Sequence, residues 1–280
     1  MINLACNYSL ETEELVRDNK IQIDYFKFPA LAFDMNILKS YDLSEFQRFA
    51  FDVKKIKPIL YHGLCPSPHN ICSTNFKNEL QVDIINKMIE MTGTPGISLH
   101  LAGADEKITK EELIKIVVSN IEFLKSKFKG LNFITLENVE KSNSIFVTDP
   151  DVISRIIRQA DTNFLLDVSH AFCSAYDRSE DFISYIHKLP LEKVYEIHIN
   201  GWAEKNGDIM SHIKINKMGY DVLKHVLDYC SPKIVTLEYG RHDDRIGIGC
   251  PVMTPNNISH KAKNEIIEQI NDLKEIIYRY

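Results

Sequence analysis

The sequence predicts a (β/α)8 barrel, an α/β fold, from three observations. Eight short apolar or β-rich runs alternate with longer segments of helical period, which is the pattern of parallel strands joined by crossover helices. The length of 280 residues suits one barrel of about 250 residues, so a single domain over 1–280 is expected. No glycine-rich phosphate loop follows the first run, which disfavours the alternative, a doubly wound open sheet.

Eight runs along the chain are the expected strands. They span 2–8, 22–28, 57–62, 96–102, 132–138, 163–168, 194–200 and 233–239. No linker rich in proline, glycine or serine, no repeat and no low-complexity segment separates them, which makes a second domain improbable.

Helical segments are expected between these strands. The clearest are 78–91, 110–128, 149–160, 219–230 and a final helix at about 258–278. In 110–128 the apolar residues follow the i, i+3, i+4, i+7 spacing of an amphipathic helix. Asp149 followed by Pro150 is a typical helix start, with a capping residue before a proline in the first turn.

Composition and charge are typical of a soluble globular protein. The chain is 44% hydrophobic and 26% charged, which allows a sizeable core. Its net charge of -6, without a Lys/Arg block, weakly disfavours a nucleic-acid partner, although bound metal ions could neutralise phosphates locally. There is no signal peptide and no run of ~20 apolar residues that could span a bilayer, so a cytoplasmic location without membrane contact is expected.

Six cysteines are scattered without a CxxC spacing, which indicates reduced, structural thiols. Cys65 and Cys72, in the loop "HGLCPSPHNIC", are the pair that could bond, ligate or react.

Six successive strands end in a residue that can bind a metal ion. These residues are His62, His100, Glu137, Asp167, His198 and Glu238. The C-terminal ends of barrel strands form one rim, where active sites lie. Each residue alone could have a purely structural role, but buried carboxylates are costly unless they are paired or bound to a cation. The convergence therefore favours a site for several metal ions.

The loops contribute three more candidate ligands. His170 lies one turn past Asp167, and Asp208 and His212 lie in the expected loop after the seventh strand. Mixed imidazole and carboxylate ligands suit zinc, iron(II) or manganese(II), and the lack of dedicated cysteine ligands disfavours a structural zinc.

Five residues near these ligands are candidates for binding substrate. Arg241 and His242 follow the eighth strand and could hold a substrate carboxylate, and Trp202 could line the pocket or cap a helix. Asn138 and Asn200, each adjacent or close to a ligand, could also orient the ligands.

The stretch "LLDVSHAFCSAYDRSEDFISYIHKLPLEKVYEIHING", with "GDIMSH" and "TLEY" after it, resembles the multinuclear non-haem iron-dependent oxidative enzymes. These enzymes have a barrel of the xylose-isomerase-like superfamily. The similarity is densest over 132–240, with support from "YHG" (61–63) and "SLHLA" (98–102). "DVSHAF" is also similar to the endonuclease four type of apurinic endonuclease, which shares the barrel and the ligand layout.

The resemblance implies two or three iron ions, with zinc or manganese as alternatives. It implies one metal at His62, His100 and Glu137, with Glu137 bridging to a second metal at Asp167, His198 and Glu238, and a third metal at His170 and His212. The related pattern often has an acidic residue two positions before the loop histidine. Met210 stands there in this chain, so the third metal depends on Asp208 substituting through a shifted loop.

The resemblance also implies the chemistry: dioxygen oxidises the cysteine of a ribosomally made peptide, or another thiol, often presented by a partner protein. Two hydrolytic or isomerising alternatives remain open on the same ligands. A metal-dependent phosphodiesterase of the apurinic endonuclease kind would activate a water. A sugar isomerase or epimerase would want a lysine or an additional acid near the substrate carbonyl, and Lys107 and Lys214 are the candidate lysines. A non-catalytic metal store or interaction module is a fourth possibility.

Overall fold

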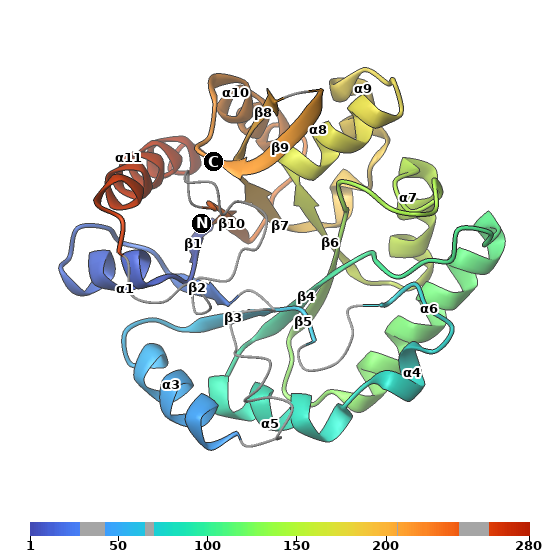
Figure 1. Cartoon of the computed structure of the whole chain (residues 1–280), viewed down its shortest axis with the longest axis horizontal. Helices are drawn as coiled ribbons and strands as arrows, with labels where there is room; N and C mark the ends of the chain where they lie inside the picture. Colours follow the sequence, from blue (N-terminus) through green and yellow to red (C-terminus); the bar gives the residue numbers. More distant parts are fainter. Residues whose placement is uncertain (29–42, 65–69, 206, 241–257) are drawn as a thin grey trace.

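A closed barrel of eight parallel strands forms the centre of the molecule (Figure 1). The computed structural model describes residues 1–28, 43–64, 70–205, 207–240 and 258–280. The strands are β1 (Asn3–Asn7), β2 (Tyr25–Phe28), β3 (Ile59–His62), β4 (Gly96–His100), β5 (Phe133–Glu137), β6 (Asn163–Asp167), β7 (Val194–Ile199) and β10 (Ile234–Leu237). They follow one another around the barrel in chain order, and β10 closes on β1. The predicted (β/α)8 fold is confirmed, and each barrel strand lies inside its predicted range.

Helices surround the barrel (Figure 1). In the described residues they are α1 (Leu10–Arg17), α3 (Ser44–Lys54), α4 (Phe76–Glu79), α5 (Val82–Thr92), α6 (Lys110–Lys127), α7 (Pro150–Gln159), α8 (Val168–Asp177), α9 (Phe182–Lys188), α10 (Lys217–Leu227) and α11 (His260–Ile277). The segment expected as one helix over 78–91 is divided between α4 and α5. Asp149 caps α7 by accepting from the backbone of Asp151 at 2.9 Å, as the sequence indicates. Within the described part of the chain, no helix combines the length and the apolar character needed to cross a membrane.

A β-hairpin replaces the loop that was expected after the seventh strand. It consists of β8 (Gly201–Lys205) and β9 (Asp208–Ile213), paired antiparallel. Gly201 permits the close pairing, because a Cβ at this position would lie 1.9 Å from the carbonyl oxygen of Lys214. The hairpin carries His212 in the left-handed region, at φ 60°.

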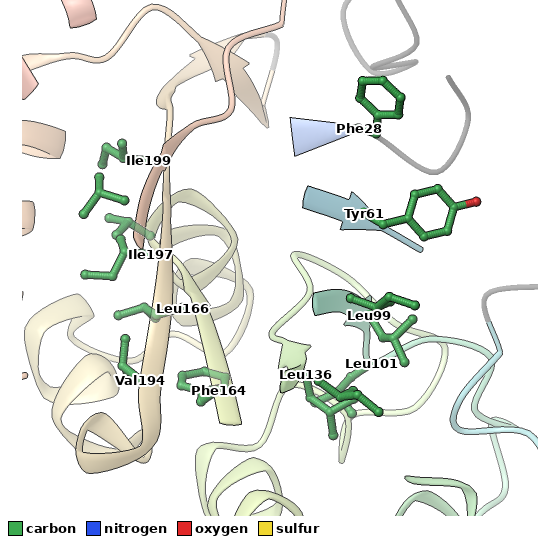
Figure 2. Close-up of a cluster of buried hydrophobic side chains, with 14 of the residues drawn as sticks. Phe28, Tyr61, Leu99, Leu101, Leu136, Phe164, Leu166, Val194, Ile197 and Ile199 are labelled. Carbon is green, nitrogen blue, oxygen red and sulfur yellow. The ribbon is translucent and has the colours of Figure 1, made fainter. Parts of the chain in front are cut away.

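Alternate strand residues point outward into the apolar core under the helices. Figure 2 shows this cluster on two sides of the barrel, with Phe28, Tyr61, Leu136, Phe164 and Ile197 directed away from the interior. All five side chains are almost completely buried. The outward residues therefore fix the strands against the helices and leave the inward positions free for other chemistry.

The inward residues change from apolar to polar along the barrel axis. At the N-terminal end, Ala5, Leu60, Phe133 and Ile234 form a small apolar cluster that Tyr25 and Tyr195 join. A bulge in β7 skips Tyr195 in the pairing with β6, because Phe164 pairs with Val194 and Leu165 pairs with Glu196. Tyr195 packs on Phe133 with ring centroids 4.4 Å apart, and the next residue, Glu196, also faces the interior. The bulge thus directs two consecutive side chains inward.

A buried ion pair, Lys27–Glu196, lies above the apolar cluster. Lys27 Nζ donates to Glu196 Oε1 at 2.8 Å, to Glu196 Oε2 at 2.7 Å and to Ser98 Oγ at 2.7 Å, which uses its three protons. Thr236 Oγ1 donates to Glu196 Oε1 at 2.7 Å. The two charged side chains are 1% and 0% exposed, so each charge depends on the other.

Replacing Lys27 alone should destabilise the barrel strongly. Lys27→Met leaves the Glu196 carboxylate buried without its cation, and we expect a loss of about 3–5 kcal/mol in the free energy of unfolding. The double variant Lys27→Met/Glu196→Gln should recover most of this loss, since no buried charge remains. Urea unfolding followed by circular dichroism measures both. Lys110→Met removes a lysine that pairs with Asp151 at the surface and serves as the control, with an expected change below about 1 kcal/mol. A loss of that size for Lys27→Met would contradict the prediction.

Candidate metal centre

Glu137, at the end of β5, lies at the middle of the polar rim. Its carboxylate oxygens are 2.8 Å from His62 Nε2, 3.5 Å from His100 Nε2, 3.5 Å from His170 Nδ1 and 3.4 Å from His198 Nδ1. Four imidazoles from four different chain segments therefore surround one carboxylate. Parallel strands produce this arrangement because their C-terminal ends meet at the same face of the barrel.

Eight of the nine predicted metal ligands converge in space. Within the described residues, four groups bring one potential ligand atom from each member within 4.8 Å of the others. They are His62, His100 and Glu137; His62, His198 and Glu238; Asp167, His170 and His212; and Glu137, Asp167, His198 and Glu238. Glu137 and Asp167 each belong to two groups, so the groups adjoin and share carboxylates.

The group of Asp167, His170 and His212 bears on the question raised by Met210. Asp167 offers this group a carboxylate that does not depend on an acidic residue two positions before His212. Asp208 lies in β9 and pairs with Lys205 near the hairpin turn, so four residues of extended strand, roughly 13 Å, separate its backbone from that of His212. That Asp208 is a ligand stays a prediction.

Glu137 and His62 have buried atoms that no hydrogen bond satisfies. Both carboxylate oxygens of Glu137 and the Nε2 atom of His62 lack a partner of acceptable geometry. Glu137 is 0% exposed, and a buried carboxylate without hydrogen bonds costs several kcal/mol (about 2–7 even for a neutral polar group) unless a cation compensates it. The donor set of imidazole nitrogens and carboxylate oxygens fits zinc, iron(II) or manganese(II).

Asp167 combines a structural role with its place at the rim. It caps α8, and its Oδ1 accepts from the backbone of His170 at 2.7 Å and from Ser169 Oγ at 2.8 Å. The cap alone explains the spacing of Asp167 and His170. Oδ2 accepts from Asn200 Nδ2 at 3.2 Å.

Asn138 and Asn200 hold three of the candidate ligands in place through hydrogen bonds. The Asn138 side chain makes two hydrogen bonds of 2.9 Å with the backbone of Asp167, and its own carbonyl lies 2.9 Å from His170 Nδ1. That contact makes Nδ1 the protonated nitrogen and leaves Nε2 of His170 free to ligate. Asn200 Oδ1 accepts from the backbone of His212 at 2.8 Å. Both asparagines are 0% exposed, which supports the orienting role and opposes direct contact with substrate.

His212 is held through two residues that sequence reasoning missed. Ser211 Oγ lies 2.7 Å from His212 Nδ1 and donates to Glu140 Oε2 at 3.0 Å. This relay directs Nε2 of His212 toward Glu238, 3.6 Å away. Glu140 lies outside the motifs that carry the resemblance, and Ser211 lies in "GDIMSH", where only the histidine and the aspartate had the side chains of metal ligands. Lys27 and Glu196 were also missed, although a charged residue in the middle of an apolar strand is a signal.

The remaining candidates lie elsewhere. Trp202 is 5% exposed and stacks on Phe172 with centroids 4.9 Å apart, which is a packing role, and its contact with substrate stays a prediction. Lys107 is exposed, and Lys214 binds Glu268 at the surface at 2.7 Å. Arg241, His242 and Cys65 lie outside the described residues. Cys72 is buried, and burial raises the pKa of its thiol far above the usual value.

Mutual electrostatics keep protons on several of the rim imidazoles. Burial lowers the pKa of His212, but its hydrogen bond to Glu238 and the nearby carboxylates outweigh burial and raise the pKa to about 9. Burial also lowers the pKa of His198, but Glu238 and Glu137 lie beside the ring and raise its pKa well above the ordinary value. Burial raises the pKa of Glu238, yet His198 and His212 hold it well below the usual range. In the metal-free protein, protons therefore supply the positive charge that the carboxylates require.

Two rim residues behave differently. His100 has a pKa lowered to about 3, mainly by burial of the ring and despite the nearby Glu137, so its imidazole is neutral. Asp167 has a raised pKa, mainly because burial disfavours its charged form.

Comparison with curated proteins gives short matches to two relatives. A UPF0276 protein of Shewanella loihica is 22% identical over 140 residues, which is 49% of this chain and 45% of that protein. A UPF0276 protein of Acaryochloris marina is 27% identical over 76 residues, which is 27% of this chain and 26% of that protein. The matched segments span less than half of either relative.

Solved structures share the barrel over almost their whole length. D-Psicose 3-epimerase of Clostridium cellulolyticum has a TM-score of 0.66 at 11% identity, over 98% of this chain and 99% of that chain. The IolI protein with a bound zinc atom has a TM-score of 0.67 at 14% identity, over 100% and 99% of the two chains. Endonuclease IV of Thermus thermophilus has a TM-score of 0.56 at 14% identity, over 98% and 99%. At these identities the likeness shows the fold alone.

A family model places the chain more narrowly. The model described as "RiPP precursor modification enzyme MbnB/TglH/ChrH" matches residues 39–244, which is more than half of the chain and includes all eight converging ligand candidates. This match confirms the resemblance to the multinuclear non-haem iron-dependent oxidative enzymes. The chain belongs to the MbnB/TglH/ChrH family of RiPP precursor modification enzymes.

Proposed function

We propose that this protein is a multinuclear iron enzyme that uses dioxygen to oxidise a cysteine thiol of a ribosomally made peptide. The observation that carries the proposal is the sharing of Glu137 and Asp167 between adjoining ligand groups, which suits two or three metal ions held close together. Ferrous ions in these groups would supply dioxygen chemistry and a binding position for a thiolate. Family membership supports a precursor peptide as the substrate.

The chain's own residues hold the ligands and leave one side of the cluster open. His100 and His212 side chains are 33% and 26% exposed, whereas His62, His170 and His198 are at most 6% exposed. The rings of His100, His170 and His212 form a row, with successive centroids 6.0 Å and 5.3 Å apart. We infer that the peptide thiol reaches the centre from the side of this row, and that the rest of the barrel excludes water from the buried ligands.

The open alternatives have less support. Sugar isomerisation would want a lysine or an additional acid near the substrate carbonyl. The lysines do not serve, because Lys107 is exposed, Lys214 forms a surface ion pair and Lys27 is fully engaged below the rim. An apurinic endonuclease would need a basic surface for DNA, which a net charge of -6 does not favour. We propose a cytoplasmic location, where ferrous ions and the free thiols of Cys6, Cys72 and Cys173 persist, and a partner protein that presents the peptide.

Metal content tests the proposal first. Protein purified anaerobically without added metal should contain two or three iron ions per chain, some of them ferrous, by elemental analysis and Mössbauer spectroscopy. Zinc or manganese without iron would overturn the oxidative assignment and direct attention to hydrolysis of abasic DNA and to sugars. The variant Glu137→Ala should lose at least one ion, since this carboxylate touches four imidazoles.

Turnover tests the chemistry separately. We expect the iron-loaded protein to consume dioxygen with a cysteine-containing precursor peptide, and His100→Ala or Glu137→Ala to abolish this consumption while circular dichroism stays unchanged, because rim residues contribute little to barrel stability. His187→Ala, which changes a histidine on the outer surface, is the matched control and should retain full activity. Unchanged rates in both rim variants would remove those residues from the reaction.

Metal uptake should release protons and strengthen with pH. A ligating imidazole nitrogen must give up its proton, and the pKa of about 9 at His212 means that this proton is still bound at neutral pH. Zinc affinity should therefore rise between pH 6.5 and 8.5, by about tenfold per pH unit for each proton displaced. Calorimetric titration in buffers of different ionisation enthalpy counts the protons. His212→Ala should lower the count, and a pH-independent affinity would contradict the mechanism.

A further inference from the structure

One carboxylate oxygen of Glu196 links the Lys27–Glu196 ion pair to His198 of the candidate metal centre. Glu196 Oε1 lies 3.2 Å from His198 Nε2, and a carboxylate can only accept, so the imidazole donates this hydrogen bond. The other ring nitrogen, Nδ1, lies 2.9 Å from Glu238 Oε2 and 3.4 Å from Glu137 Oε1. His198 thus turns Nε2 toward the barrel floor and Nδ1 toward the ligands.

We propose that Glu196, held in place by Lys27, is a positioning residue that fixes His198 as a metal ligand through Nδ1. The inference rests on the proposed metal centre and adds to it a tautomer, a ring orientation and the group responsible. Metal-bound histidines commonly donate their second ring N–H to a carboxylate, which fixes the tautomer and makes the ligating nitrogen more basic.

Lys27 makes this arrangement possible at full burial. Glu196 and His198 are each 0% exposed, and a lone carboxylate there would be too costly to remain. The ammonium of Lys27 bonds both oxygens of Glu196, and Thr236 adds a third donor at Oε1. The carboxylate is thereby immobilised from below, and a rigid anchor transmits its orientation to the ring above it.

The positions of Glu196, His198 and Lys27 on their strands support the positioning role of Glu196. Glu196 and His198 both face the interior because they lie two residues apart on β7, and the β7 bulge turns Tyr195 inward beside Glu196. Lys27 comes from β2, three strands away from β7 around the closed barrel. The ion pair therefore joins two separate strands directly beneath the candidate ligand His198.

The test uses manganese(II) alone, measured by the electron paramagnetic resonance signal of the free ion, on the full chain. Lys27→Met/Glu196→Gln removes both charges, so a change in affinity cannot come from an unpaired lysine repelling the cation. We expect the double variant to bind manganese about 10–100-fold more weakly than the wild type. Thr162→Val removes a buried hydrogen bond to Ile134 at the opposite end of the barrel and should bind manganese as the wild type does.

Zinc-loaded protein gives a second readout that a merely structural role would not move. Long-range nitrogen–proton correlations of the wild type should show His198 bound through Nδ1 and protonated at Nε2, and the double variant should lose this single pattern. Wild-type ligation through Nε2, or equal manganese affinity in the wild type and the double variant, would overturn the inference and leave the metal centre intact. Failure of the wild type to bind either ion would overturn the metal centre itself, and this inference with it.

Discussion

The interior of this barrel contains buried carboxylates whose negative charge must be compensated, and two kinds of cation compensate it. Glu196 is neutralised by Lys27, a cation that belongs to the chain and cannot leave. Glu137, Asp167 and Glu238, further along the barrel axis toward the rim, have imidazoles as their neighbouring cations. Imidazoles can exchange their protons for metal ions, whereas an ammonium at that depth cannot be removed without destabilising the fold. The lower charge is therefore structural, and the upper charge is available for a cofactor.

Because side chains alternate along a strand, the same strand contributes some residues to the packing under the helices and others to the polar interior. Each barrel strand gives its outward side chains to the apolar layer under the helices and its inward side chains to the polar axis (Figure 2). The final inward position of six strands then faces the rim, so a ligand can be placed there without disturbing the packing outside. The bulge in β7 interrupts this alternation at Tyr195, whereas Glu196 lies beneath His198 because the two residues are two positions apart on the same strand.

The sequence predicted the parts of the molecule that follow from periodicity and from strand ends. The barrel and its strands were predictable because regularly spaced apolar runs that alternate with amphipathic helices are typical of few folds. The convergence of six candidate ligands at the rim was predictable because each lies at or near the C-terminal end of such a run. The relay from His212 through Ser211 to Glu140 was not, because it joins a loop after β5 to a hairpin strand, and no local pattern reports a contact across 71 residues. The hairpin itself was predicted as a loop for a similar reason, since its pairing depends on the close approach of Gly201 and Lys214.

Trp202 illustrates how a residue can matter to the site without touching it. The Asp167, His170 and His212 group combines residues of β6 and α8 with one residue of the hairpin, so its geometry depends on how the hairpin sits against α8. Trp202, in β8, stacks on Phe172 of α8, two residues after His170, and its carbonyl accepts from Asn216 Nδ2 at 2.8 Å. This apolar contact packs the hairpin against α8, and Asn200 adds polar contacts by bonding both Asp167 and His212. The geometry of this edge of the cluster therefore depends on packing between separate elements, which suits the side where the proposed peptide substrate would enter.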